Sequence, residues 1–390
     1  MAAPQEPARV VAARRTPFGA VHGLLSGWHP VDLLAHTLSV TLDDAGLTGG
    51  DVDAVLVGCA HPVGAQSANV ARAAVLAAGW PDTIPATTVE RGAGSSHRAL
   101  QLASHTIAAG AADVVVVGGV EVMSLVPAGA PGLNRQYGAI WGAGPAGRYA
   151  AEGGLVPSGV AGDRLAAGAG IDRAEQDAEA ARGRDRATAA GHLPWLVMTP
   201  VNCNDRDRPR AALAVMVDDE IPPQAVDDDQ APMHDDEGTV AASNIAPAAD
   251  GAAVAVLAST TWLSERGRSA PSCMRGGAEA ATSPVTVFGA GPDAARRALE
   301  QAGVAVGELV GAELDGPHAA AVLHLRRAIG LDEEIANRVG GSLGRGRPLG
   351  AVGVAMLADG LGPTSVQPGP VLLVDESDDG TATATVVGPA

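Results

Sequence analysis

The alternation of short apolar runs with longer helical patterns constrains the fold of this chain most strongly. Residues 52–58 (VDAVLVG) and 112–119 (ADVVVVGG) are rich in Val and bounded by Gly and Asp, as buried strands are. Residues 67–79 and 95–111 lie between these runs and carry helical patterns. Because strands joined through helices usually run in one direction, the alternation predicts an α/β fold with a mostly parallel sheet.

The second half of the chain repeats this order. Residues 308–314 and 370–376 are expected to be strands, and residues 295–303 and 317–330 to be helices. A Gly-rich turn within residues 337–357 leads into a further helix. The similar order of elements predicts an internal duplication.

The stretch from about residue 121 to about residue 240 differs from both halves. It is rich in Gly, Pro and acidic residues and has few strand signals. Residues 218–237 contain nine acidic residues and no basic ones, without the ligand spacing of a calcium loop. We expect a solvated, mobile excursion here.

Composition excludes several classes of function. The 390 residues carry a net charge of −18 and show no basic stripe, which argues against a nucleic-acid partner. No apolar run approaches the roughly 20 residues of a membrane span, and the N-terminus lacks the apolar core of a signal peptide. Three distant cysteines form neither a disulfide framework nor a metal-ligand pattern, so we expect a cytoplasmic location and no metal. Cys59 is expected to be a buried core thiol, Cys203 lies in the excursion, and Cys273 is expected in a polar loop.

Residues 88–100 (TVERGAGSSHRAL) predict a strand end, a tight turn and the start of a helix. Such an elbow commonly carries a nucleophile, because the N-terminus of a helix stabilises negative charge. The residue at this elbow is Ala93, which has no reactive atom.

Five segments together resemble the thiolase superfamily, specifically bacterial acetyl-CoA acetyltransferases and 3-ketoacyl-CoA thiolases, over nearly the whole chain. Residues 118–124 (GGVEVMS) resemble the family's GGxExMS segment, and residues 340–351 (GGSLGRGRPLGA) its GGAIALGHPxGA segment. The other three segments are residues 13–25, 69–96 and 236–253.

The resemblance implies a thiolase fold, in which two duplicated halves form α/β/α/β/α layers with an inserted loop domain. The N-terminal half would comprise residues 1–120 with about 240–262, the loop domain residues 121–239, and the C-terminal half residues 263–390. The family catalyses reversible Claisen condensation of acyl thioesters. It implies coenzyme A thioesters as possible ligands, no required cofactor, and a tight dimer.

The resemblance also implies that the polar catalytic positions have changed while the scaffold glycines persist. Ala93 stands where the family has its nucleophilic Cys, and Arg347 where it has the His base, although an Arg stays protonated and cannot be a base. Asp315 and His318 replace the Asn and Phe of the family's NEAF segment, Glu376 replaces its second Cys, and Ala246 replaces a substrate-side Ser. Ala246, His97 and Gly350 would line a residual acyl-thioester pocket.

Three functions remain open. The first is a non-catalytic subunit that pairs with an active thiolase or ketosynthase-like partner in fatty acid, polyketide or steroid metabolism. The expected assembly is a homodimer or a heterodimer with a thiolase-like paralogue, and only the heterodimer fits this first function. The second is a repurposed acyl-CoA enzyme, such as an aldolase-like one with a small accessory subunit, that uses Arg347, Glu376 and His318. Some thiolase-like aldolases use tyrosines in place of the Cys. That mechanism has little support here, because the two tyrosines, Tyr137 and Tyr149, both lie in the excursion.

The third is an acyl-CoA or acyl-carrier binding module, with phosphates held by Arg135, Arg148, Arg164 and Arg173. The nearby acidic run argues against tight binding of coenzyme A. A purely structural interpretation also exists for the elbow region, in which Glu90, Arg91 and His97 are packed or solvated and Arg347 pairs with Glu376 or Asp315.

Overall fold

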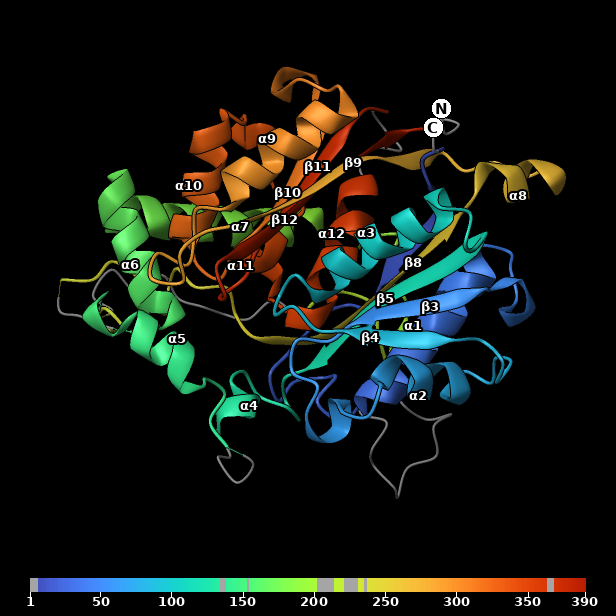
Figure 1. The fold of residues 1–390 in the computed structure, drawn as a ribbon, viewed down its shortest axis with the longest axis horizontal. Coiled ribbons are helices and arrows are strands. Elements are labelled where there is room, and N and C mark those ends of the chain that lie inside the picture. Colours follow the sequence, from blue (N-terminus) through green and yellow to red (C-terminus); the bar gives the residue numbers. More distant parts are fainter. Residues whose placement is uncertain are drawn as a thin grey trace.

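The computed structural model describes residues 6–133, 138–152, 154–201, 214–220, 231–234, 237–362 and 368–390. Cys203, Arg135 and Tyr137 therefore lie outside the described residues. One sheet runs through both halves of the chain in the order β10-β11-β12-β9-β1-β8-β5-β3-β4, and β2 (Gly19–Ala20) pairs with β8 (Figure 1). The strands along it are β10 (Gly311–Asp315), β11 (Val371–Glu376), β12 (Thr381–Pro389), β9 (Ser272–Ala281), β1 (Arg9–Arg15), β8 (Ala249–Ala258), β5 (Val114–Val122), β3 (Ala54–Gly58) and β4 (Ala86–Val89).

The expectation of a mostly parallel sheet is wrong, because the sheet is mixed. β3 pairs in parallel with β4 and β5, and β10 with β11, as helical crossovers require. The other neighbours along the sheet are antiparallel. The turn at residues 377–380 forces β11 and β12 to run in opposite directions, and β8 enters the sheet after the long excursion, so no helical crossover fixes its direction.

The helices cover the sheet in three layers, giving the expected α/β/α/β/α order (Figure 1). α1 (Pro30–Asp44) and α2 (Val70–Ala77) cover the strands of the N-terminal half, around one apolar core. α9 (Gly291–Ala302) and α10 (Ala319–Ile329) cover those of the C-terminal half, around another. α3 (Ser95–Ala108) and α12 (Val352–Leu361) lie in the middle layer and contact strands of both halves.

The two middle helices approach each other so closely that only glycine fits between them. α12 is buried along Val352–Gly360, as expected of a helix enclosed on all sides. A Cβ atom on Gly353 would overlap the backbone of His97 in α3, and one on Gly58 at the end of β3 would overlap the backbone of Ser96. The first turn of α3 is therefore fixed between β3 and α12.

The excursion contains more structure than the sequence indicates. It forms α4 (Ala130–Leu133), α5 (Ala143–Arg148), α6 (Ser158–Ala169) and α7 (Arg173–Ala190), and the strands β6 (Thr199–Pro200) and β7 (Val215–Met216) pair with each other. α7 packs against α10 and α11 (Gly341–Arg345) of the C-terminal half. The boundaries of the loop domain remain a prediction.

The solvated interpretation of the acidic run holds for the exposed Asp218 and is wrong for Asp219, whereas residues 221–230 and 235–236 lie outside the described residues. The Asp219 side chain is fully buried and pairs with Arg15. The Glu220 carboxylate accepts hydrogen bonds from the backbone N–H groups of Ala20 and Leu24, at 3.0 Å each. Charge count alone does not reveal buried cationic partners that lie elsewhere in the chain.

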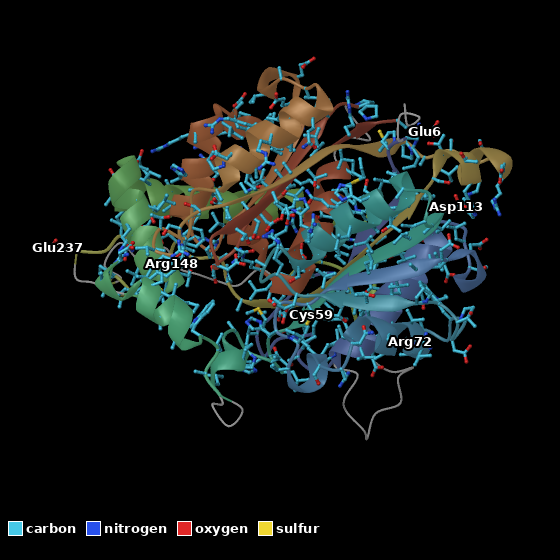
Figure 2. The ribbon with its side chains drawn as sticks, in the orientation of Figure 1. Glu6, Cys59, Arg72, Asp113, Arg148 and Glu237 are labelled. Carbon is cyan, nitrogen blue, oxygen red and sulfur yellow. The ribbon has the colours of Figure 1, made fainter. Side chains whose placement is uncertain are left out.

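The two described cysteines are both buried. Cys59 follows β3 with no exposed surface, which confirms the prediction of a core thiol (Figure 2). The prediction for Cys273 is wrong, because this residue lies in β9 with 5% of its surface exposed. β9 pairs with β1 on one side and with β12 on the other, so Cys273 lies inside the sheet, opposite Arg9 and Gly388. Of the described helices, none is long and apolar enough to cross a membrane.

Candidate functional site

The predicted elbow is present between β4 and α3. Gly92 takes the left-handed conformation with φ +51°, which lets the chain turn sharply. The Ser95 hydroxyl accepts a hydrogen bond from the Arg91 N–H at 2.8 Å and donates one to the Gly92 carbonyl at 2.6 Å. Ala93 lies inside this turn with 4% of its surface exposed.

The space in front of the elbow is occupied by the turn between β11 and β12. The Gly94 N–H donates to the Ser377 hydroxyl at 3.0 Å, and this hydroxyl donates to the Arg91 carbonyl at 3.3 Å. A Cβ atom on Gly94 would overlap the Arg91 guanidinium and a carboxylate oxygen of Asp375. An amide at the N-terminus of α3 is thus engaged by a side chain of this chain.

Asp375 is the centre of a buried polar network beneath the elbow. One carboxylate oxygen lies 3.0 Å from Arg91 Nη2, and the other lies 2.6 Å from His97 Nδ1. The second ring nitrogen of His97 lies 2.9 Å from the Thr385 hydroxyl. Arg91 also donates to Thr381 and Thr383, because alternate residues of β12 face the same side of the sheet.

The charge balance of this network favours the ionised form of Asp375. Burial raises the pKa of its carboxyl, but the charge of Arg91 and the hydrogen bond from His97 outweigh burial and hold that pKa below its usual value. Glu90 contributes only a carboxylate that accepts from the Gly92 N–H at 3.0 Å. Sequence reasoning placed His97 and Arg91 near the site but missed Asp375 and Ser377.

Arg347 and Asp315 form a second buried pair on the C-terminal side. Arg347 Nη2 and Nε lie 2.7 and 3.0 Å from Asp315 Oδ2, and the two side chains are 4% and 0% exposed. Burial lowers the pKa of Arg347, but the adjacent Asp315 carboxylate outweighs burial and raises it. Ser342 donates a further hydrogen bond to Asp315. Arg347 was expected to pair with Glu376 or Asp315, and the structure shows the pair with Asp315.

The Glu376 carboxylate, the alternative partner expected for Arg347, does not pair with it. Arg347 Nη2 reaches only the Glu376 backbone carbonyl, at 3.0 Å. The carboxylate points to the opposite side of β11, where Oε1 accepts from the N–H groups of Gly289 and Gly291 at 2.9 and 2.7 Å. Burial raises the pKa of Glu376, and Oε2 is buried with no hydrogen-bond partner among the described residues.

Because neighbouring residues of a strand face opposite sides, Asp375 and Glu376 cannot both face the elbow. The alternation of side chains between the two faces of β11 is the sequence signal that separates Asp375, beside α3, from Glu376, on the opposite face.

His318 closes the C-terminal side of the site. It caps α10 through Nδ1, which accepts from the Ala321 N–H at 3.3 Å, and its ring lies 4.7 Å from that of Phe288. Burial, with the charge of Arg347, lowers the pKa of His318 to about 3, so the ring is neutral near pH 7. Ala246 lies beside it, with its N–H bonded to the Pro317 carbonyl at 2.8 Å.

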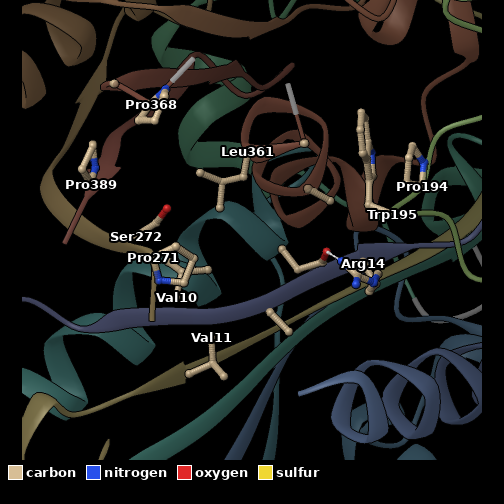
Figure 3. Close-up of a pocket in the computed structure, with 15 residues that line it drawn as sticks. Val10, Val11, Arg14, Pro194, Trp195, Pro271, Ser272, Leu361, Pro368 and Pro389 are labelled. Carbon is tan, nitrogen blue, oxygen red and sulfur yellow. Dashed lines mark hydrogen bonds between the residues drawn. The ribbon is translucent and has the colours of Figure 1, made fainter. Parts of the chain in front are cut away.

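The residues expected to line an acyl-thioester pocket, namely Ala246, His97 and Gly350, do not line the three cavities described here, and this pocket stays a prediction. Gly350 donates its N–H to the buried Glu121 carboxylate at 2.9 Å, and Glu121 belongs to the GGVEVMS segment. One cavity, of about 520 Å³, lies between β1 and the end of α12 beside Trp195 (Figure 3). Neither it nor the two smaller ones are lined by Ala93, His97, Ala246, Gly350 or Glu376.

The arginines expected to meet phosphates are dispersed. Arg148 lies on exposed α5 (Figure 2). Arg164 donates to the Val285 carbonyl at 3.2 Å, and Arg173 bonds Asp177 and Ser243. The described residues contain no group of three His, Cys, Asp or Glu side chains that could hold a metal ion.

Comparisons with known proteins show which family this sequence and fold resemble. The model of the N-terminal domain of thiolase matches residues 8–261, and that of the C-terminal domain matches residues 271–364. An acetyl-CoA acetyltransferase of Chromobacterium violaceum is 33% identical over 358 residues, which cover 89% of this chain and 90% of that protein. A steroid 3-ketoacyl-CoA thiolase of Mycobacterium tuberculosis is 30% identical, with 91% and 87% covered, and a 3-ketoacyl-CoA thiolase of Bacillus subtilis is 31% identical, with 89% and 90% covered.

Proposed function

The chain belongs to the thiolase family, and we propose that it acts there as a non-catalytic subunit that pairs with an active thiolase or ketosynthase-like partner in acyl-thioester metabolism. The observation that carries this proposal is the buried Arg347–Asp315 pair. The family resemblance puts a His base at Arg347, and a paired guanidinium takes up no proton near neutral pH.

The nucleophile is the second support. Ala93 has no thiol, and the described cysteines do not supply one, because burial raises the pKa values of both Cys59 and Cys273. A thiol is a useful nucleophile only when its thiolate is accessible and its pKa is low. Neither cysteine meets these conditions.

The packing of the site is the third support. Arg91 bonds Asp375, His97 bonds Asp375, and Arg347 bonds Asp315, so the charges neutralise one another inside the protein. Ser377 engages the Gly94 amide that would otherwise be available to a developing oxyanion. A subunit that retains the fold for pairing, and no longer binds a reacting thioester, would keep this arrangement.

The test is to isolate the tagged chain gently from its native host and to weigh the intact complex by native mass spectrometry. We expect a heteromer that contains a second thiolase-like chain with its Cys and His intact. Recombinant protein alone should not cleave acetoacetyl-CoA with coenzyme A. A homodimer as the sole species, or thiolysis by the purified chain free of contaminating thiolase, would reject the proposal.

One observation favours the second function, a repurposed acyl-CoA enzyme. Glu376 is a buried acid with a raised pKa and a free carboxyl oxygen, which is the form expected of a general acid or base. The comparison of the natural protein with Glu376→Gln against a panel of acyl-CoA thioesters and aldehydes tests it. Turnover that is lost in Glu376→Gln would establish an enzyme. The third function, an acyl-CoA or acyl-carrier binding module, has less support, because Arg164 and Arg173 are engaged within the protein.

A further inference from the structure

A second buried charge cluster lies away from the elbow, where β1, α11, α12 and residues 218–220 meet. The Arg15 guanidinium donates to Asp219 at 2.6 and 3.0 Å and to Asp359 at 2.8 Å. Arg345 also donates to Asp219. None of these four side chains is more than 7% exposed. Two positive and two negative charges are therefore enclosed together, and they balance.

Glu313 is a fifth ionisable group at this cluster. It lies on β10 and is 4% exposed. With Arg345, Asp359 and Ser342 it lines a cavity of about 20 Å³, which is room for about one water molecule. The guanidinium nitrogens nearby are already engaged, since Arg345 also donates to the carbonyls of Val339 and Ala187.

An ionised Glu313 would leave one uncompensated negative charge among buried side chains, which is costly. Burial, and next the charge of Asp359, raises the pKa of Glu313 well above its usual value. Arg345 and Arg15, together with the more distant Arg186 of α7, act in the opposite direction without overcoming burial. Charge count and environment thus agree on a neutral carboxylic acid.

We propose that Glu313 is a proton-controlled switch for residues 214–220: as a neutral acid it leaves Arg345 bound to Asp219, and as a carboxylate it draws Arg345 across the cavity and loosens Asp219. The proton passes to solvent and no covalent bond changes. Asp219 would then keep only Arg15 as a cationic partner.

The contacts of Asp219 provide a local readout. Its carboxylate accepts from the Phe18 N–H at 2.7 Å, and the neighbouring Glu220 N–H donates to the Phe18 carbonyl at 2.8 Å. Loosening of Asp219 exposes the Phe18 amide to exchange with solvent, whether or not the rest of the fold remains intact.

The experiment measures hydrogen exchange of the Phe18 amide by mass spectrometry, as a protection factor corrected for the intrinsic effect of pH. We expect protection in the natural protein to fall at least about tenfold between about pH 7 and about pH 9.5, as the buried acid ionises. In Glu313→Gln, which cannot ionise, protection should stay constant over the same range.

Two further variants keep the outcome decisive. Asp219→Asn should show low protection of Phe18 at every pH. Glu376→Gln alters another buried glutamate with a raised pKa, so the pH response of Phe18 should remain as in the natural protein. Constant protection in the natural protein, or an equal fall in natural protein and Glu313→Gln, would overturn the proposal.

Discussion

Arg347 Nη2 and Nε both contact Asp315 Oδ2, at 2.7 and 3.0 Å, in a pair that is almost completely shielded from water. A buried ion pair of this kind contributes little net stability compared with two apolar side chains of similar size. Removing one partner is strongly destabilising, because the other partner is then a buried, unpaired charge.

We therefore expect Arg347→Ala to lower the free energy of unfolding by about 3–5 kcal/mol, since Asp315 would remain buried without its partner. Urea unfolding monitored by circular dichroism measures the change. The matched control is the double variant Arg347→Met with Asp315→Leu, which removes both charges and should lose much less. A single variant as stable as the natural protein would show that the pair is dispensable.

Ala93→Cys alone should not restore thiolysis of acetoacetyl-CoA. The introduced thiol would lie at a helix N-terminus, but Arg347 cannot accept its proton and Ser377 and Asp375 occupy the adjacent space. Coenzyme A-dependent loss of acetoacetyl-CoA absorbance measures the activity, with Ala93→Ser as the control. Clear turnover by the Cys variant would mean that the base lies elsewhere in the chain.

Asp375 should contribute to stability at neutral pH and lose that contribution in acid. Its pKa in the folded protein lies below the unfolded value, so the stabilisation is present above the unfolded pKa and is lost as the pH falls through the folded pKa. Asp375→Asn should be less stable at about pH 7 and should lose less stability than the natural protein between about pH 5 and about pH 2.

Thermal unfolding at several pH values measures this difference. Asp293→Asn is the control, because Asp293 is exposed and pairs only with Arg296 on the surface of α9. An acid profile of Asp375→Asn that parallels the natural one would contradict the prediction.

Gly353→Ala should lower the free energy of unfolding by about 1–3 kcal/mol, because the added methyl group overlaps the backbone of His97. Gly168→Ala in α6 is the matched control: its Cβ would meet open space, and the gain in helix propensity should make it neutral or slightly stabilising. Differential scanning calorimetry of both variants distinguishes the effects. Equal melting temperatures would show that α12 can move away from α3.

The sequence predicts the elements well because their signals are local. The Val-rich runs become β3 and β5, and the elbow lies where its glycines indicate. The direction of β8 could not be predicted, because it depends on where the chain returns after the excursion. The burial of Asp219 was equally hidden, since its cationic partners Arg15 and Arg345 lie more than 120 residues away.

The candidate site could be predicted in part. Opposite charges at aligned motif positions indicated that Arg347 pairs with Glu376 or Asp315, and the structure shows that the partner is Asp315. The role of Asp375 was missed because family alignment drew attention to the neighbouring Glu376. Only the alternation of sides along β11 separates the two residues, one facing α3 and the other α9.

The contact between α3 and α12 has a further consequence for how this chain can change over time. The position of the elbow depends on the absence of a side chain at Gly58 and Gly353, which lets α3 pack closely against β3 and α12. It does not depend on the side chain at the elbow itself. The architecture at Ala93 therefore does not depend on a reactive side chain there, whereas one extra methyl group at either glycine would disturb it. The shape of the site is inherited separately from its reactivity, so the fold preserves an elbow whether or not a nucleophile occupies it.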